Sequence, residues 1–174
     1  MNKRLLSVAV GLMLTGLSSV NVISVSAVQG ESSVHKFKDG GIQFILPAGW
    51  DTKSEKDSIK VFPKGGSIQI AVVALPINTD LKADEKQSLF DSLSEKAGIT
   101  DVRLGDYVDN QTMGGMKVAA RPFEGKNNGH DVEGVYYLLS ADKFVFIVLL
   151  AEKSASDALG NEAISVIKSI KKIE

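Results

Sequence analysis

The chain has 174 residues, of which 44% are hydrophobic and 24% charged, a composition typical of one ordinary globular domain. Its 20 Lys and Arg residues nearly balance its 21 Asp and Glu residues, so the formal net charge of −1 gives no basic footprint for nucleic acid or an anionic membrane. The sequence has no cysteine, which excludes disulfides, thiolate catalysis, iron–sulfur clusters and Cys-ligated zinc.

The N-terminal segment is typical of a cleavable Sec-type signal peptide. Lys3 and Arg4 give it a short positive start, and an apolar run over residues 5–17 follows. The run has about 13 residues, fewer than the roughly 20 that an α-helix needs to span a bilayer. The small residues Val25-Ser26-Ala27 fit the positions that signal peptidase recognises, so we expect the mature chain to begin at Val28.

These features divide the chain into a signal peptide over residues 1–27, a linker over 28–34 and one domain over 35–174. A lipid anchor is excluded, because lipidation requires a cysteine at the cleavage point and the chain has none. We expect the mature protein to be soluble, in the periplasm or outside the cell, without stable membrane insertion.

The first half of the domain is predicted to hold short strands followed by a helix. Apolar residues alternate or cluster over 42–46, 59–62 and 67–75, and the Gly40-Gly41 turn precedes the first of these strands, which Pro47-Ala48-Gly49-Trp50 ends. The helix is expected to be capped by Thr79 or Asp80, to end at Gly98, and to have an apolar face that comprises Leu89, Phe90, Leu93 and Ala97.

The second half is predicted to be a run of four strands and a closing helix. The strands span 102–111, 117–123, 131–140 and 144–150. The last of them, FVFIVLL, is apolar at both alternating sets of positions, which is typical of a central strand covered on both faces. The helix has Ser154 or Ser156 as its cap and an apolar stripe of Leu159, Ala163, Val166, Ile167 and Ile170. The predicted fold class is therefore α+β, a central antiparallel β-sheet flanked by helices on both faces.

Two segments resemble the PsbP-like family. FKDGGIQFILPAGW, residues 37–50, is similar to the family's opening, where a short hairpin leads into a strand, a proline and a tryptophan. GVYYLLSADKFVFIVLLAEK, residues 134–153, and the helix after it, which ends in Val166-Ile167-Lys168-Ser169-Ile170, are similar to the family's end. The resemblance implies a central antiparallel sheet between helices, as in PsbP, Mog-type and DcrB-type proteins, and a role that is not enzymatic.

His130, Asp131 and Glu133 form the one local cluster in the sequence with metal-ligand chemistry. Alternation along a strand places Asp131 and Glu133 on one face and His130 on the other. A Zn²⁺ or Mn²⁺ site would need a further ligand, such as His35 or Asp109. The alternative is a polar hairpin end beside the Asn-Asn-Gly turn. We favour this interpretation, so no metal or other cofactor is predicted.

No catalytic residue is predicted. A serine nucleophile needs a positioned base and an orienting acid, and His35 and His130 are the two histidines available. A carboxylate pair such as Asp106 with Asp109 has the chemistry of a glycosidase, but nothing separates it from solvated loop charges. Trp50, the single tryptophan, is either an exposed anchor for a partner or, as we favour, a ring that covers one end of the sheet core.

We therefore expect an exported, non-enzymatic protein-interaction module of the cell envelope, whose partner is another envelope or secreted protein. The alternative is a carrier of a small apolar ligand in a pocket between the sheet and one helix. The apolar strands over 68–75 and 144–150 permit such a pocket.

Overall fold

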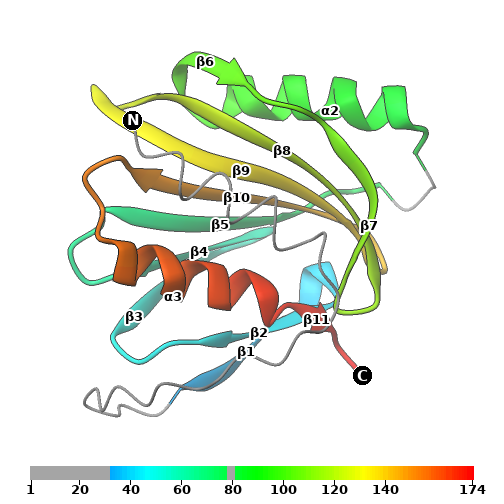
Figure 1. Ribbon diagram of the computed structural model, residues 1–174. Coiled ribbons are helices and arrows are strands. Elements are labelled where there is room, and N and C mark those ends of the chain that lie inside the picture. Colours follow the sequence, from blue (N-terminus) through cyan, green and yellow to red (C-terminus); the bar gives the residue numbers. More distant parts are fainter. Residues whose placement is uncertain (1–31, 78–80) are drawn as a thin grey trace, which may run out of the picture.

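The computed structural model describes residues 32–77 and 81–174 (Figure 1). The predicted signal peptide over 1–27, the predicted cleavage point and the two candidate cap residues Thr79 and Asp80 lie outside the described residues. No helix in the described part of the chain is long and apolar enough to cross a membrane.

The main element of the described structure is one large antiparallel sheet. Its strands are β3 (Trp50–Glu55), β4 (Ser58–Pro63), β5 (Ile68–Ala74), β6 (Thr100–Leu104), β7 (Val108–Met113), β8 (Met116–Asn127), β9 (His130–Ser140) and β10 (Phe144–Glu152). The described strands run in the order β3-β4-β5-β10-β9-β8-β6, and β7 also pairs with β8. The neighbours β8, β9 and β10 follow one another along the chain, as expected for a meander built on tight turns.

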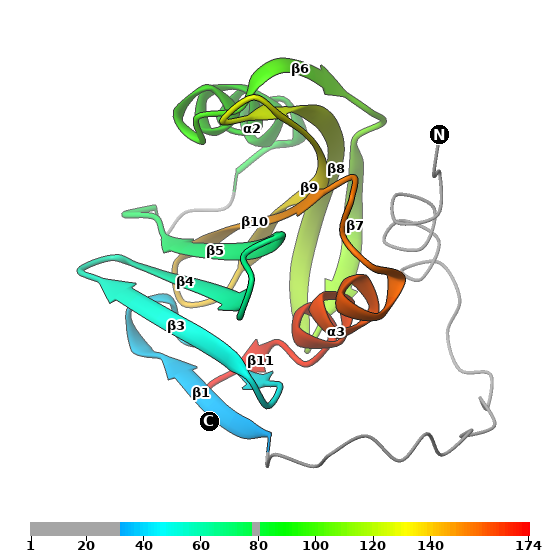
Figure 2. The same ribbon diagram turned by 90° about the vertical axis from the view of Figure 1, so that its left-hand side faces the viewer.

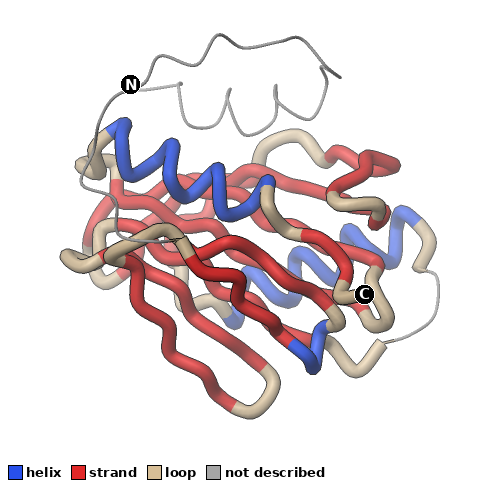
Figure 3. Tube along the Cα trace, turned by 90° about the horizontal axis from the view of Figure 1, so that it is seen from below, coloured by secondary structure: helices blue, strands red, loops and turns tan. Residues whose placement is uncertain are grey.

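Two helices of the described part of the chain and a small second sheet cover the large sheet. Helix α2 (Ala83–Lys96) and helix α3 (Asp157–Lys168) lie on opposite sides of it, as Figures 1 and 3 show. The small sheet has the order β1-β2-β11 and is formed by β1 (Ser33–Phe37), β2 (Ile42–Leu46) and β11 (Lys171–Lys172). The 3-10 turn η1 (Lys38–Gly40) joins β1 to β2.

Strand β10 lies between β5 and β9 and supplies side chains to both faces of the large sheet. On one face, Val145, Ile147 and Leu149 belong to the α3-side core, which also holds Ala163, Val166 and Ile167 of α3 and Ile42 and Phe44 of β2. On the other face, Phe146 and Val148 belong to the α2-side core with Phe90, Phe123 and Tyr136. The prediction of a central strand covered on both faces is confirmed, and so is the placement of the helices on both faces.

Several boundaries agree with the sequence-based expectations for local reasons. The Ser156 side chain accepts a hydrogen bond from the Leu159 N–H at 3.4 Å, which makes it the N-cap of α3. Gly98, just beyond α2, has a φ of +70°, a conformation that favours glycine and ends a helix.

The structure corrects three expectations. Residues 50–55 form a strand and do not continue the turn that ends β2, because pairing with β4 supplies the order that their polar side chains do not. The predicted strand over 102–111 is two strands, β6 and β7, with a break where the Gly105 N–H donates to the Pro122 carbonyl oxygen at 2.8 Å. Strand β1 begins at Ser33, two residues before the predicted start of the domain.

Candidate functional site

A groove of about 360 Å³ lies on the α2 side of the large sheet, between α2 and strands β4, β5 and β10. Its floor is apolar and is formed by Ala71 and Val73 of β5 and by Phe146, Val148 and Leu150 of β10. Leu93 of α2 and the following residues Ala97 and Ile99 form a wall, and the polar residues Lys60, Gln69, Lys96 and Asn127 complete the lining.

The groove exists because α2 covers only part of its side of the sheet. Figure 2 shows α2 beside β6, β8 and β9, whereas no described helix lies over the same face of β3 and β4. The register explains the floor: Ala71 of β5 pairs with Val148 of β10 on one side and with Lys60 of β4 on the other. A methyl group at position 71, between longer neighbours, leaves the space that a larger side chain would fill.

The floor is held by stacked aromatic rings. Tyr136 stacks on Phe123 with ring centroids 4.2 Å apart and on Phe146 with centroids 5.7 Å apart. Phe90 of α2 contacts the same Phe146 ring at a centroid distance of 6.2 Å. Since Phe146 also lines the groove, one wall helix and three central strands fix the position of the floor.

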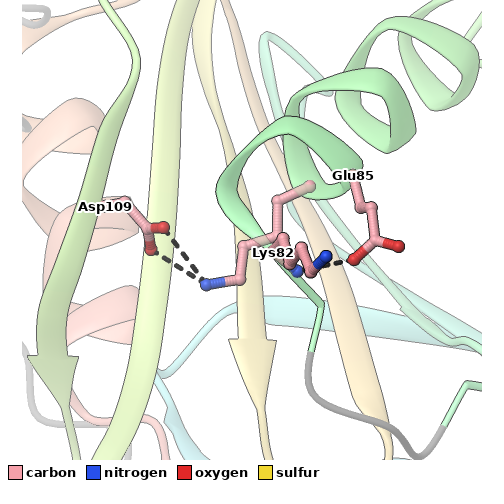
Figure 4. Close-up of polar contacts among 4 residues, drawn as sticks. Lys82, Glu85 and Asp109 are labelled. Carbon is pink, nitrogen blue, oxygen red and sulfur yellow. Dashed lines mark hydrogen bonds and ion pairs between the residues drawn. The ribbon is translucent and has the colours of Figure 1, made fainter.

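Two ion pairs attach α2 to the sheet. The Lys86 ammonium lies 3.1 Å from Oδ1 and 3.2 Å from Oδ2 of Asp109 on β7, and each of the two side chains is 13% exposed (Figure 4). One turn further along, Asp91 accepts a hydrogen bond of 2.8 Å from Nη1 of Arg121 on β8. These contacts attach α2 to β7 and β8, on the side of the helix away from β4 and β5.

The first turn of α2 is ordered by its own side chain. The Lys82 backbone N–H donates to Oε2 of Glu85 at 2.7 Å (Figure 4), which satisfies one amide that the start of a helix leaves without an intrahelical partner. Near the same helix, burial raises the pKa of the Tyr107 hydroxyl, and the charge of Asp109 raises that pKa further.

The lining residues offer apolar contact, amide hydrogen-bonding groups and positive charge. Among the described residues that line the groove, Lys60 and Lys96 are the ionisable ones. These are the groups of a binding site for a largely apolar molecule.

The structure separates the residues that the sequence suggested as metal ligands. His130 and Asp131 are exposed at the start of β9, whereas Glu133 is 4% exposed. His35 stacks on Phe44 in the small sheet, and Asp109 is bound to Lys86. No group of three His, Asp or Glu side chains in the described part of the chain could hold a metal ion.

Glu133 is a buried carboxyl group that we expect to cost stability at neutral pH. Burial raises its pKa above the ordinary value of 4.5, the Lys153 charge lowers the pKa, and the nearby Glu124 raises it. Between the two pKa values the unfolded chain binds fewer protons than the folded one, so the free energy of unfolding falls as the pH rises through that window. Glu133→Gln should therefore raise the free energy of unfolding at pH 7 and have little effect below pH 4.5.

Urea unfolding at several pH values would measure this effect. Asp131→Asn, an exposed neighbour on the same hairpin, controls for the loss of one negative charge. A gain from Glu133→Gln that is equal at both ends of the pH range would contradict the assignment to carboxyl burial.

The structure also places Trp50 and the two carboxylates Asp106 and Asp109 that the sequence analysis weighed and set aside. The Trp50 ring is 6% exposed in the α3-side core, and its indole N–H donates to Oε2 of Glu162 on α3 at 2.8 Å. The ring therefore covers the core, as the favoured interpretation expects. Asp106 is exposed, whereas both carboxylate oxygens of Asp109 are bound by the Lys86 ammonium.

Sequence reasoning finds the strands of the groove but not the groove itself. The strands over 68–75 and 144–150 are apolar enough for a pocket, whereas no local pattern singles out Lys60 and Lys96. Both lysines look like ordinary surface residues in the sequence, and only the register of β4 and the direction of α2 bring them to one site.

No family model and no curated protein matches the chain. Among solved structures, cyanobacterial PsbP (CyanoP) from Synechocystis sp. PCC 6803 is similar, with a TM-score of 0.61 and 12% identity over 90% of this chain and 99% of that one. A protein from Bacteroides thetaiotaomicron has a TM-score of 0.50 and 14% identity over 84% of this chain, which spans 50% of that chain. LpqN of Mycobacterium tuberculosis, involved in cell envelope biogenesis, has a TM-score of 0.49 and 14% identity over 83% of this chain and 91% of that one.

The likeness to CyanoP covers nearly all of both chains. At 12% identity it establishes architecture and not activity. The chain has the PsbP-like fold.

Proposed function

We propose that this chain is a non-enzymatic binding module that works outside the cytoplasm and carries a small apolar ligand in the groove beside α2. The groove is the observation that supports this function best. Its volume of about 360 Å³ lies within the range of small-molecule sites, roughly 300–1,000 Å³, and its floor is formed by aliphatic and aromatic side chains. This interpretation places the ligand-carrier function ahead of the protein-interaction function that the sequence alone favours.

The energetics set a minimum size for the ligand. Each methylene group buried against the floor contributes about 0.8 kcal/mol. Association costs at least about 4 kcal/mol in lost translational and rotational freedom, so roughly five buried methylene groups are needed before any net affinity appears. The ligand is therefore a molecule with an aliphatic chain or several fused rings, and not a small polar metabolite.

Native mass spectrometry of the chain purified from its own host tests the proposal. We expect an additional mass bound to the wild-type protein and to Ala158→Trp, in which the ring stands on the exposed face of α3. Ala97→Trp fills the groove from the wall just after α2 and should remove that mass, and Ala71→Leu, which fills it from the floor, should do the same. Circular dichroism checks that each variant folds. A wild-type protein with no bound mass would contradict the proposal.

Export is the second part of the proposal and rests on residues 1–27. N-terminal sequencing of secreted material should begin at Val28. A retained Met1 would contradict it.

A protein-interaction function remains the second candidate, supported by the small sheet. Val34 and Ile45 pair across β1 and β2 and are 62% and 47% exposed, the large hydrophobic side chains that the described part of the chain leaves open to water. A pull-down from an envelope fraction should recover a partner with wild-type protein and lose it with Val34→Ser/Ile45→Ser. Equal recovery by both proteins, or none by either, would contradict this candidate.

A further inference from the structure

The apolar groove has two lysines at its margin, one from the sheet and one from the helix. Lys60 projects from β4 and Lys96 is the last residue of α2, and both side chains are exposed. Neither ammonium group makes an ion pair with the described part of the chain. A purely apolar ligand would make no favourable contact with these two unpaired positive charges.

The other charges on this face do not cancel the two lysines. Lys53 of β3 lies directly across from Lys60 in the strand register, and Glu55 is bound to Lys53 at 3.8 Å. Asp51, at the far end of β3, pairs with Phe62 and not with Lys60. On α2, Lys86 is neutralised by Asp109 and Asp91 by Arg121. Among the described residues, Lys60 and Lys96 are the charged groups that line the groove, so the charge of the lining is positive.

The helix explains why a lysine stands at position 96, but the sheet gives no such structural reason for Lys60. A cation in the last turn of a helix is favoured by the helix dipole, which gives Lys96 a role in α2 itself. Lys60 stands in an interior strand, with Ala71 as its neighbour on β5, and has no such role. A lysine there keeps its aliphatic stem along the floor and its charge at the water boundary, where an anion could meet it.

We propose that the groove binds a single-chain anionic amphiphile, a fatty acid, with its chain on the floor of β5 and β10 and its carboxylate between Lys60 and Lys96. The inference rests on the proposed function, since it specifies the ligand of the same groove. A carboxylate at this margin gains two partly exposed ion pairs, each worth up to about 1 kcal/mol, or roughly a fivefold change in affinity.

Calorimetric titration with three ligands of equal chain length tests the charge directly. Dodecanoate, dodecanol and dodecyltrimethylammonium are added below their micelle-forming concentrations to the full exported chain. We expect dodecanoate to bind most tightly, dodecanol more weakly and the cation weakest. The preference for dodecanoate over dodecanol should shrink as salt is added, because exposed ion pairs are screened.

Substitution of each lysine tests where the carboxylate of the ligand binds. Lys60→Gln and Lys96→Gln should each weaken dodecanoate about fivefold and leave dodecanol unchanged. Lys64→Gln is the matched control, since Lys64 is an exposed lysine in the turn that follows β4 and lies outside the groove. Equal binding of dodecanoate and dodecanol, or a dodecanoate preference that survives both substitutions, would overturn the anionic ligand and leave the apolar carrier standing. Failure of all three ligands to bind would overturn both.

Discussion

Gly134→Ala is expected to lower the free energy of unfolding by about 3 kcal/mol, because the position has no room for a methyl group. A Cβ atom on residue 134 would meet the Leu149 carbonyl oxygen of β10, which is backbone and cannot turn aside. It would also lie 2.6 Å from Cζ of Phe123, the residue opposite Gly134 on β8. Phe123 in turn stacks on Tyr136, so a shift of its ring disturbs the aromatic stack that reaches the groove floor.

Urea unfolding would measure the loss, and Gly66→Ala provides the comparison. Gly66 has a φ of +72°, and a Cβ atom there would have no other atom within 4 Å, so its substitution costs backbone strain alone, about 1–2 kcal/mol. A Gly134→Ala cost no larger than that of Gly66→Ala would contradict the close approach of β8, β9 and β10 at this point.

Asp109→Ala is expected to cost about 3 kcal/mol, because it leaves the Lys86 ammonium without its partner in a site where each side chain is only 13% exposed. The double variant Lys86→Met/Asp109→Leu should recover much of that loss, since replacing both charges by apolar groups removes the desolvation cost as well as the attraction. Removing Asp109 should also lower the pKa of Tyr107, because the carboxylate is one cause of its elevation.

Equilibrium unfolding gives the free energies of unfolding of the single and double variants. The ultraviolet absorbance of tyrosinate gives the pKa of Tyr107. Tyr137 is the internal reference, since burial alone raises its pKa and Asp109 has no part in it. A loss below about 1 kcal/mol, the value of an exposed ion pair, would contradict the view that Lys86 and Asp109 attach α2 in a largely dry contact.

The parts of the fold that can be predicted from the sequence are those with a strong local pattern. Strand β10 is apolar at both alternating sets, α3 has a serine cap and an apolar stripe, and the Asn128-Gly129 turn has the residues of a tight hairpin. In each of these the side chains themselves specify the conformation, so no distant contact is needed to recognise it.

The parts that the sequence does not predict depend on distant contacts. The residues of β3 after Trp50 are polar and exposed, and their extended conformation comes from pairing with β4. The break between β6 and β7 depends on Pro122, 17 residues after Gly105 in the sequence, and the Cβ that Gly105 lacks would lie 2.8 Å from the Pro122 ring. The groove is of the same kind, because its lining comes from β4, β5, β10 and α2.

Strand β3 is an edge strand of the large sheet, and its charged side chains affect whether another strand can pair with it. If a second copy of the chain added its own β3 in antiparallel pairing centred on Lys53, that lysine would face itself and Asp51 would face Glu55. Every charged pair across the new contact would then be of like sign, which opposes pairing. The charges on this edge thus oppose joining two copies in that register, whereas moving the centre of the pairing by one residue would place Lys53 opposite Asp51 or Glu55 and make the contact attractive.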